Sequence, residues 1–187
     1  MKVMILTGSN RKEATSTKLA EHAAHFISQH GEKVTVFDLY KRPLPFYSPD
    51  EIYTEHEHLN ELKQEMLAAD AVILVTPEYH GSVSGVLKNA IDHLGQAHFN
   101  GKVVLSASSA GGAVGISSLL QLQAIVRNLH GINTPDWISI GGLQRKRFEV
   151  GYDGYEGGQE IEDRIHLVLE AFLNLARKID RSAGAIQ

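Results

Sequence analysis

Short apolar runs alternate with longer segments of helical periodicity along the chain. The runs occupy residues 2–6, 34–37, 71–75, 103–107 and 137–140. The first, third and fourth carry aliphatic residues at both odd and even positions, which is typical of strands covered on both faces. The pattern therefore predicts five strands, with these three inside the sheet.

Between the runs, apolar residues recur three or four positions apart, as they do on one face of a helix. The segments with this spacing are residues 16–30, 57–69, 86–94, 116–130 and 160–179. Gly31 and Gly131 follow the first and fourth segments, where a glycine commonly ends a helix. Strands that alternate with helices predict one α/β domain over residues 1–187, with a parallel sheet and helices on both faces. Ligands of such a sheet bind at the carboxyl ends of its strands.

Composition excludes several kinds of chemistry. The 187 residues include no cysteine, so disulfides, iron–sulfur clusters, thiolate zinc sites and cysteine nucleophiles are not possible. The net charge of -4 disfavours nonspecific binding of nucleic acid. Neither an export signal nor an apolar stretch of about 18 residues is present, so we expect a cytoplasmic protein without a membrane span.

The loop after the first run is rich in groups that bind anions. Gly8 permits a tight turn, Arg11 has a guanidinium able to hold a phosphate, and the next helix begins nearby. The hydroxyls come from Ser9, Thr15, Ser16 and Thr17. Together they predict a phosphate site at the start of the helix. The alternative is that Thr15 or Ser16 only caps the helix.

This loop is not of a kind that binds a triphosphate or a dinucleotide. It lacks both the Gly-Lys-Ser/Thr ending of a Walker loop and the G-x-G-x-x-G pattern. A monophosphate remains, and FMN is the leading candidate among cofactors that carry one and bind to a sheet of this type.

Residues 71–94 carry a longer motif, AVILVTPEYHGSVSGVLKNAIDHL. It resembles the P-E-Y-N/H-x-S-x-P/S-G-x-L-K-N-A-I/L-D signature of NAD(P)H-dependent FMN reductases, and the first loop resembles their G-S/T-x-R-x-x-S motif. His80–Gly81 followed by Ser84–Gly85 looks most like the bacterial azoreductase branch. The resemblance runs from residue 1 to about residue 180. It implies a flavodoxin-like fold with five parallel strands in the order 2-1-3-4-5.

The resemblance also implies how a flavin is held. The backbone N–H groups of Pro77–Gly81 would meet the edge of the isoalloxazine, where reduction places negative charge. Tyr79 either packs beside the ring or stacks on it, and proton donation by His80 is the less favoured alternative. The small residues of the loop after the fourth run would lie beside the flavin, unless that loop merely leads into the next helix. The full set of expected contacts is Ser9, Arg11, Thr15, Ser16, Thr17, Pro77, Glu78, Tyr79, His80, Gly81, Ser109, Gly111 and Gly112.

The chain departs from the family pattern at several positions. Ala14 replaces the usual serine three residues after the arginine, so which of Thr15, Ser16 and Thr17 supplies the hydroxyl stays open. His80 stands where many members have asparagine, Ser84 where many have proline, and His93 where many have an aromatic residue.

The activity that the resemblance implies needs no catalytic side chain and no metal. NADPH or NADH would pass hydride to FMN by a ping-pong mechanism, and a small flavin, quinone, azo or metal-oxyanion acceptor would then take the electrons. We expect a homodimer or homotetramer whose interface includes residues 86–94, although Lys88 and Asp92 also suit an exposed ion pair. The alternatives are an FMN electron carrier that does not use NAD(P)H, and a structural domain that binds nothing.

The last motif is the glycine-rich stretch 141–158 with Arg145, Lys146 and Arg147 in a row. It suits either a loop that covers the site or binds the 2′-phosphate of NADPH, or a solvated run of charge. Two other constellations are rejected. The histidine pairs 22/25 and 56/58 lack further metal ligands, and GSVSG at 81–85 has no serine at its third position for a nucleophile elbow.

Overall fold

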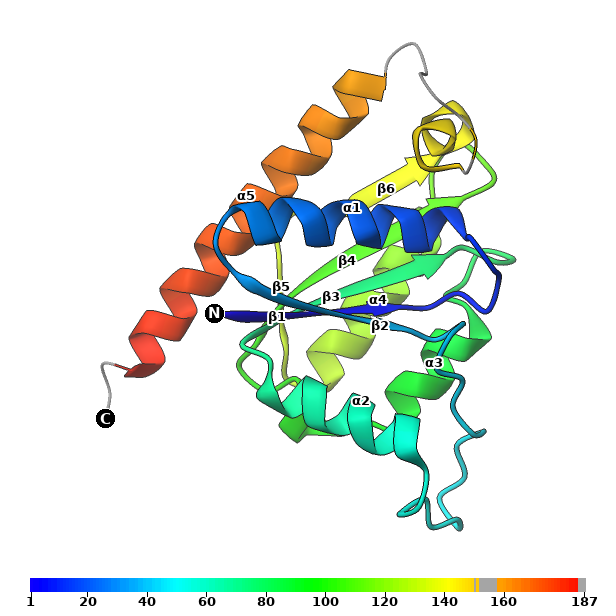
Figure 1. The fold of residues 1–187 in the computed structure, drawn as a ribbon, viewed down its shortest axis with the longest axis vertical. Coiled ribbons are helices and arrows are strands. Elements are labelled where there is room, and N and C mark those ends of the chain that lie inside the picture. The colour runs from blue at the N-terminus through cyan, green and yellow to red at the C-terminus, as the bar shows by residue number, and fades with distance from the viewer. Residues whose placement is uncertain (150, 152–157, 185–187) are drawn as a thin grey trace.

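The computed structural model describes residues 1–149, 151 and 158–184 and alternates strands with helices as predicted (Figure 1). The strands are β1 (Lys2–Thr7), β2 (Lys33–Asp38), β3 (Ala71–Pro77), β4 (Val103–Ala110), β5 (Ile132–Asn133) and β6 (Ile138–Gly141). The α-helices are α1 (Thr15–Gln29), α2 (Glu57–Ala68), α3 (Gly85–Asp92), α4 (Ile116–Asn128) and α5 (Gly158–Gly184). Two 3₁₀-helices, η1 (Gln96–His98) and η2 (Gly142–Phe148), were not predicted.

The sheet is parallel and its order, β2-β1-β3-β4-β5, confirms the predicted 2-1-3-4-5. The predicted fifth strand is divided in the structure into two short strands, which both pair with β4. Ile132–Asn133 pairs with Val103 and Val104, and Ile138–Gly141 pairs with Ala107–Ala110. Pro135 lies between them and has no N–H for the ladder, which interrupts the strand. The predicted run 137–140 corresponds to the second piece, β6.

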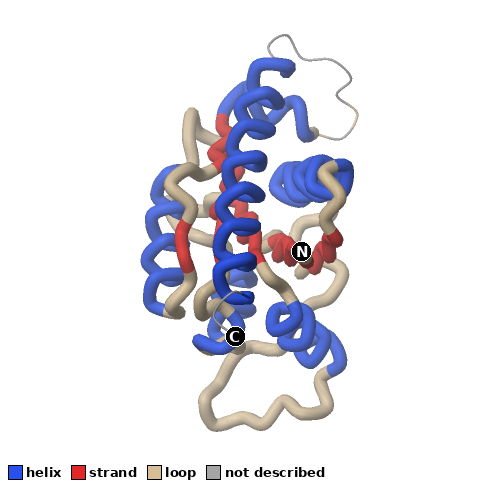
Figure 2. Tube along the Cα trace, turned by 90° about the vertical axis from the view of Figure 1, so that its left-hand side faces the viewer, coloured by secondary structure: helices blue, strands red, loops and turns tan. Residues whose placement is uncertain are grey.

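Alternate residues of the central strands enter two separate cores, one on each face of the sheet. Val3 and Ile5 of β1 pack against α1 and α5, whereas Met4 and Leu6 pack against α2, α3 and α4. Figure 2 shows the strands lying between the helices. All residues of β3 and β4 are buried, as their aliphatic runs predicted. The predicted helices on both faces are confirmed.

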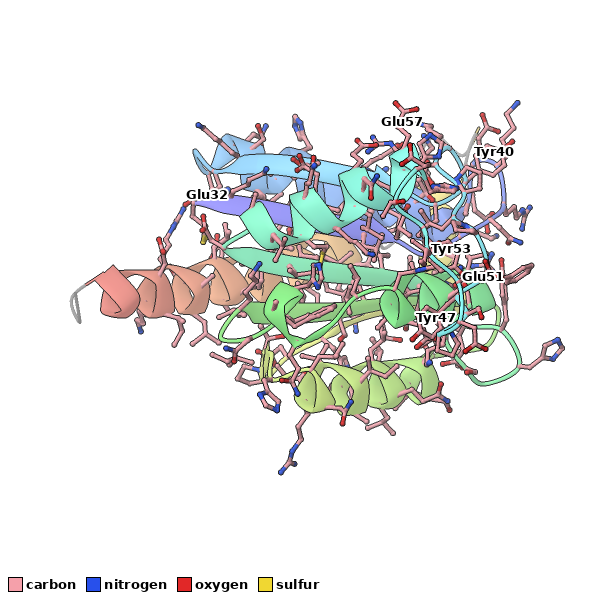
Figure 3. The ribbon with its side chains drawn as sticks, turned by 90° about the horizontal axis from the view of Figure 1, so that it is seen from below. Glu32, Tyr40, Tyr47, Glu51, Tyr53 and Glu57 are labelled. Atoms are coloured by element: carbon pink, nitrogen blue, oxygen red, sulfur yellow. The ribbon has the colours of Figure 1, made fainter. Side chains whose placement is uncertain are left out.

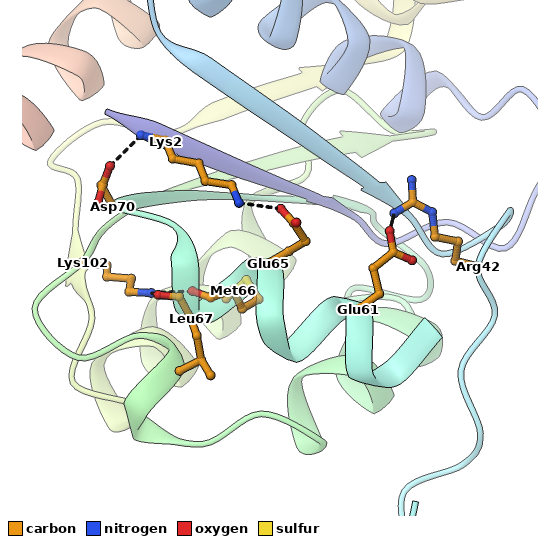
Figure 4. A network of polar contacts seen from close by, with 8 residues as sticks. All are labelled: Lys2, Arg42, Glu61, Glu65, Met66, Leu67, Asp70 and Lys102. Carbon is orange, nitrogen blue, oxygen red and sulfur yellow. Dashed lines mark hydrogen bonds and ion pairs between the residues drawn. The ribbon is translucent and has the colours of Figure 1, made fainter. Parts of the chain in front are cut away.

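Polar groups at the amino ends of the strands are paired within the chain (Figure 4). The backbone N–H of Lys2 donates to Asp70 Oδ2 at 2.6 Å, and its side chain pairs with Glu65 at 3.0 Å. Lys102 donates to the carbonyls of Met66 and Leu67, the last turn of α2, where a cation is favourable. Burial lowers the pKa of Lys102, although Asp70 nearby raises it. These contacts stabilise the end of the sheet that is far from the predicted site.

Candidate functional site

The loops after β1, β3 and β4 meet at the carboxyl ends of their strands and enclose a cavity of about 250 Å³. The residues that line it are Arg11, Ala14, Thr15, Ser16, Pro77, Glu78, Tyr79, Ser109, Gly111 and Arg145. Eight of the thirteen predicted contacts are in this set. Ser9, Thr17, His80, Gly81 and Gly112 do not line the cavity, and Arg145 lines it without having been assigned to this site from the sequence.

The α1 N-terminus opens into the cavity without a side-chain cap. Its N-cap is Ala14, so the expectation that Thr15 or Ser16 only caps the helix is wrong. The hydroxyls of Ser16 and Thr17 are buried, and neither has a hydrogen-bond partner in the described part of the chain. The first N–H groups of a helix also lack intrahelical acceptors. This helix end therefore has several donors without acceptors among the described residues, and Ser16 among them lines the cavity, which suits an anion.

The first loop is held in place by β3 and α3. The N–H of Gly8 donates to Val75 O at 2.7 Å, and its carbonyl accepts from the hydroxyl of Ser84. A Cβ on Gly8 would lie 2.5 Å from Leu87 Cβ, so only glycine lets the loop approach α3 so closely. Ser9 is buried inside the loop, where its oxygen accepts the N–H of Arg11 at 3.1 Å. Ser9 therefore shapes the loop from behind the cavity.

In the turn after β3, two of the five residues expected to meet the flavin through their backbone still have an N–H available for it. Tyr79 and Ser82 bond to each other in both directions at 3.0 Å, which makes a tight hairpin. Its central residues, His80 and Gly81, have φ of +51° and +71°, and positive φ at both positions is what a type I′ turn requires. Pro77 has no N–H, and the N–H of Glu78 donates to Ser109 O at 2.9 Å. Within the described residues, the His80 and Gly81 N–H groups are the ones in 77–81 left for a ligand.

Glu78 has a structural role that the sequence did not indicate. Its carboxylate accepts from both the N–H and the hydroxyl of Ser118, each at 2.9 Å. The N-cap of α4 is Gly115, which has no side chain to cap the helix, so Glu78 caps it from the neighbouring loop. The carboxylate thus joins the turn after β3 to the first turn of α4.

The loop after β4 contributes one face of the cavity. Ser109 and Gly111 line it, whereas the carbonyl of Gly112 accepts from the N–H of Gly142 at 2.6 Å. Gly112 therefore attaches this loop to η2.

Arg145 and Arg147 of the predicted charge run 145–147 contact different parts of the protein. Arg145 reaches back to the α1 N-terminus, where its Nη2 lies 3.5 Å from Thr15 Oγ1. Arg147 pairs with Glu162 of α5. The run is therefore not one solvated surface, and Arg145 belongs to the cavity. Residues 150 and 152–157 of the predicted 141–158 loop lie outside the described residues.

The histidines of the two rejected pairs include two with structural contacts, His22 and His56. His56 caps α2 by accepting from Leu59 N–H at 3.3 Å, and His22 stacks on His166 with ring centroids 5.1 Å apart. Within residues 1–149, 151 and 158–184, no three potential ligands are grouped to hold a metal ion. In the same part of the chain, no helix has the length and apolar character needed to cross a bilayer.

The region around α3 contains the ion pair that was predicted and a set of loop contacts that was not. Lys88 and Asp92 form the exposed i,i+4 ion pair at 2.7 Å. Asn89 and His93 hold the loop between β2 and α2, since Asn89 Nδ2 donates to Pro45 O at 2.8 Å and His93 Nε2 lies 2.9 Å from the same oxygen. In Figure 3 this loop, with Tyr47 and Tyr53, lies at the end of the molecule opposite Glu32.

Comparison with known proteins assigns this architecture to a family. A family model described as NADPH-dependent FMN reductase matches residues 1–144. An FMN-dependent NADPH-azoreductase of Staphylococcus aureus (strain USA300) is 38% identical over 181 residues, which cover 93% of this chain and 94% of that protein.

Two solved structures show the fold at lower sequence identity. FerB, a flavoenzyme NAD(P)H:(acceptor) oxidoreductase from Paracoccus denitrificans, superposes with a TM-score of 0.74 at 21% identity, covering 95% of this chain and 97% of its own. A flavodoxin from the domain Archaea gives a TM-score of 0.61 at 14% identity, covering 96% and 99%. An enzyme and a flavodoxin thus share this fold, so the family match and the 38% identical relative decide between them.

Proposed function

The chain belongs to the NADPH-dependent FMN reductase family and is an FMN-dependent NAD(P)H oxidoreductase, and from that premise we propose which residues hold the flavin and which acceptors it serves. The observation that carries the proposal is the uncapped N-terminus of α1 with the buried, unpartnered hydroxyls of Ser16 and Thr17. A phosphate there would accept hydrogen bonds from the first N–H groups of α1 and from Ser16. Ser16 is the hydroxyl we assign to the phosphate, because it lines the cavity and lacks a partner.

The flavin ring is assigned to the other side of the cavity. Ser109 and Gly111 line the cavity and are small enough for a flat ring to lie against their backbone. His80 and Gly81, in the turn next to the cavity lining, offer backbone N–H groups to the edge of the ring. Bound FMN supplies the two-electron chemistry that accepts hydride from a nicotinamide and passes electrons to an acceptor. Fixed N–H dipoles at its edge stabilise negative charge where the reaction develops it.

No side chain is assigned a proton-transfer role. Glu78 lines the cavity, but both hydrogen bonds of its carboxylate go to Ser118. His80 is exposed on the tip of the turn. The chain acts by holding the flavin and by leaving one side of the cavity open, so that nicotinamide and acceptor bind there in turn. Tyr79, which is 43% exposed at the rim, suits stacking of planar acceptors such as quinones, azo compounds or free flavins.

Steady-state turnover tests this function directly. The purified protein, loaded with FMN, is mixed with NADPH or NADH and a quinone or an azo dye, and nicotinamide oxidation is followed by absorbance. We expect oxidation that depends on both FMN and the acceptor. A protein that binds FMN but turns over neither nicotinamide would instead be an electron carrier.

We further propose that residues 1–187 act as one domain in the cytoplasm and assemble as a homodimer or homotetramer. A groove of about 370 Å³ between α3 and α4 supports the assembly, because Ile91, Leu94, Ile125 and Leu129 line it. Light scattering of the eluting protein measures the mass, and a monomer at micromolar concentration would contradict the assembly.

A further inference from the structure

Arg145 brings a second guanidinium to the cavity from a distant part of the chain. It lies in η2, yet it lines the same cavity as Arg11 of the first loop. Its Nη2 is 3.5 Å from Thr15 Oγ1, and its Nη1 lies 3.8 Å from the position that a Cβ on Gly111 would take. The guanidinium therefore spans the gap between the α1 N-terminus and the loop after β4.

The hydrogen bonding of Arg145 is incomplete. Its Nε is buried and has no partner among the described residues, its contact with Thr15 is long, and its ion pair with Glu149 measures 3.8 Å. Other partly buried arginines are well paired, as in the 2.6 Å bond of Arg42 to Glu61 and the 2.7 Å bond of Arg177 to Glu32. A buried donor without an acceptor is unfavourable unless a ligand supplies one.

The unsatisfied donors near Arg145 call for a ligand with several acceptor oxygens. They are the hydroxyl of Ser16, the first N–H groups of α1 and Arg145 Nε. A phosphomonoester has three terminal oxygens and nearly two negative charges, which match this set better than the single charge of a carboxylate.

We propose that Arg145 binds the 5′-phosphate of FMN and thereby makes the site selective for FMN over riboflavin. This rests on the proposed function, because it assumes that the cavity holds the flavin. Arg145 closes the phosphate site on the side of the β4 loop and η2, and Arg11 reaches it from the exposed rim. Arg147, paired with Glu162 of α5, has no part in it.

Flavin binding to the apoprotein tests the role of Arg145 without any turnover. FMN and riboflavin are each titrated into the wild type, Arg145→Ala, Arg145→Gln and the control Arg147→Ala, with flavin fluorescence as the readout. We expect both Arg145 variants to bind FMN about ten- to a hundredfold more weakly, as the loss of a charge-assisted bond implies. Their affinity for riboflavin should change less than about threefold, and Arg147→Ala should match the wild type for both ligands.

Three outcomes would overturn the assignment. Unchanged FMN affinity in a folded Arg145 variant removes the residue from the site. Equal losses for FMN and riboflavin assign it a merely structural role. A changed ratio of the Michaelis constants for NADPH and NADH, with unchanged FMN affinity, assigns Arg145 to the 2′-phosphate of the nicotinamide instead. A wild type that binds neither flavin contradicts the proposed function itself, which distinguishes that failure from the first three.

Discussion

The two ends of the parallel sheet treat buried polar groups in opposite ways. At the amino ends, Glu32 pairs with the N-terminal amine at 2.8 Å and with Arg177 at 2.7 Å, and Lys102 is bonded to the end of α2 (Figure 4). At the carboxyl ends, Ser16, Thr17 and Arg145 keep buried atoms without partners among the described residues. Most polar groups at the amino end thus serve stability, with Asn133 Oδ1 beside the start of β4 as an exception, whereas the carboxyl end leaves several for a ligand.

The largest effect is expected from breaking the amino end at Glu32. Glu32→Gln leaves the N-terminal amine and Arg177 without their shared carboxylate. We expect it to lower the free energy of unfolding by about 2 kcal/mol, because solvent screens the partly exposed Arg177 but not the largely buried amine and carboxylate. FMN affinity should stay within about twofold of the wild type. Urea unfolding and flavin titration measure the two quantities. Glu170→Gln, an exposed change on α5, is the control, and a loss of FMN affinity as large as the loss of stability would contradict the separation of the two ends.

The same carboxylate gives the amino end a pH dependence. Burial raises the pKa of Glu32, but hydrogen bonds from the N-terminal amine and Arg177 outweigh it and hold the pKa below its ordinary value. The stability from this pair should therefore be present above the ordinary glutamate pKa and be lost as pH falls from there towards the lower folded value. Unfolding curves between neutral pH and pH 3.5 should show a smaller acid loss in Glu32→Gln.

Ser16→Ala tests the carboxyl end of the sheet, and we expect it to weaken FMN binding without destabilising the fold. Ser16→Ala removes a buried hydroxyl that has no protein partner, so the free energy of unfolding of the apoprotein should change by less than about 0.5 kcal/mol. FMN affinity should fall about tenfold through the lost bond to phosphate. Ser28→Ala, exposed near the end of the same helix, is the matched control. If Ser16→Ala destabilises the apoprotein and leaves FMN affinity unchanged, Ser16 belongs with the structural groups.

Glu78 lies at the cavity like the groups left for a ligand, but its carboxylate is bonded to Ser118 like the groups that stabilise the fold. Glu78→Gln keeps an acceptor oxygen and loses the charge at the α4 N-terminus, so we expect a loss of about 1 kcal/mol in the free energy of unfolding. The rate of flavin reduction by NADPH in single turnover should change less than about threefold, a range below the effect of removing a general acid or base. A loss of a hundredfold or more would make Glu78 catalytic.

A smaller effect is expected at Arg11, because its side chain is exposed and has no hydrogen-bond or ion-pair partner among the described residues. Arg11→Ala should weaken the binding of FMN by about two- to fivefold, since an ion pair between an exposed guanidinium and the phosphate contributes little to affinity. That difference should shrink as salt rises, which titration at low and high ionic strength measures. A salt-independent loss would indicate that Arg11 acts from a buried position.

The smallest effect is expected midway between the two ends, at His22 of α1. Burial lowers the pKa of His22, and neighbouring His166 lowers it further. The unfolded chain therefore binds a proton more readily than the folded one, and stability should fall as pH drops below the ordinary histidine value. Unfolding curves at pH 7 and pH 5.5 for wild type and His22→Gln check this, because the variant should lose less stability.

The sequence predicted those features of the site that depend on local pattern. The order of strands brings the loops after β1, β3 and β4 together, so residues chosen from those loops, such as Arg11, Ser16 and Ser109, line one cavity. The role of Glu78 as a cap for α4 was not predicted, because it depends on a contact between residues 40 positions apart.

From the sequence, Arg145 suited a loop that covers the site or binds the 2′-phosphate of NADPH, or a run of solvated charge, but it was not predicted as a contact of the flavin. It lies 130 positions from Thr15, and its approach depends on how η2 packs after β6. The division of the fifth strand had a local signal in Pro135, which interrupts the ladder.

Packing against Leu87, and not contact with the cavity, restricts which residues can replace Gly8 during evolution. Gly8 does not line the cavity, yet the space beside it is filled by Leu87, so any larger residue would require the first loop and α3 to move apart. Residues that touch a ligand can change during evolution at some loss of affinity, which a higher cofactor concentration offsets. No concentration of cofactor removes a steric overlap at position 8, so Gly8, which does not line the cavity, is harder to replace than a residue whose loss only weakens binding.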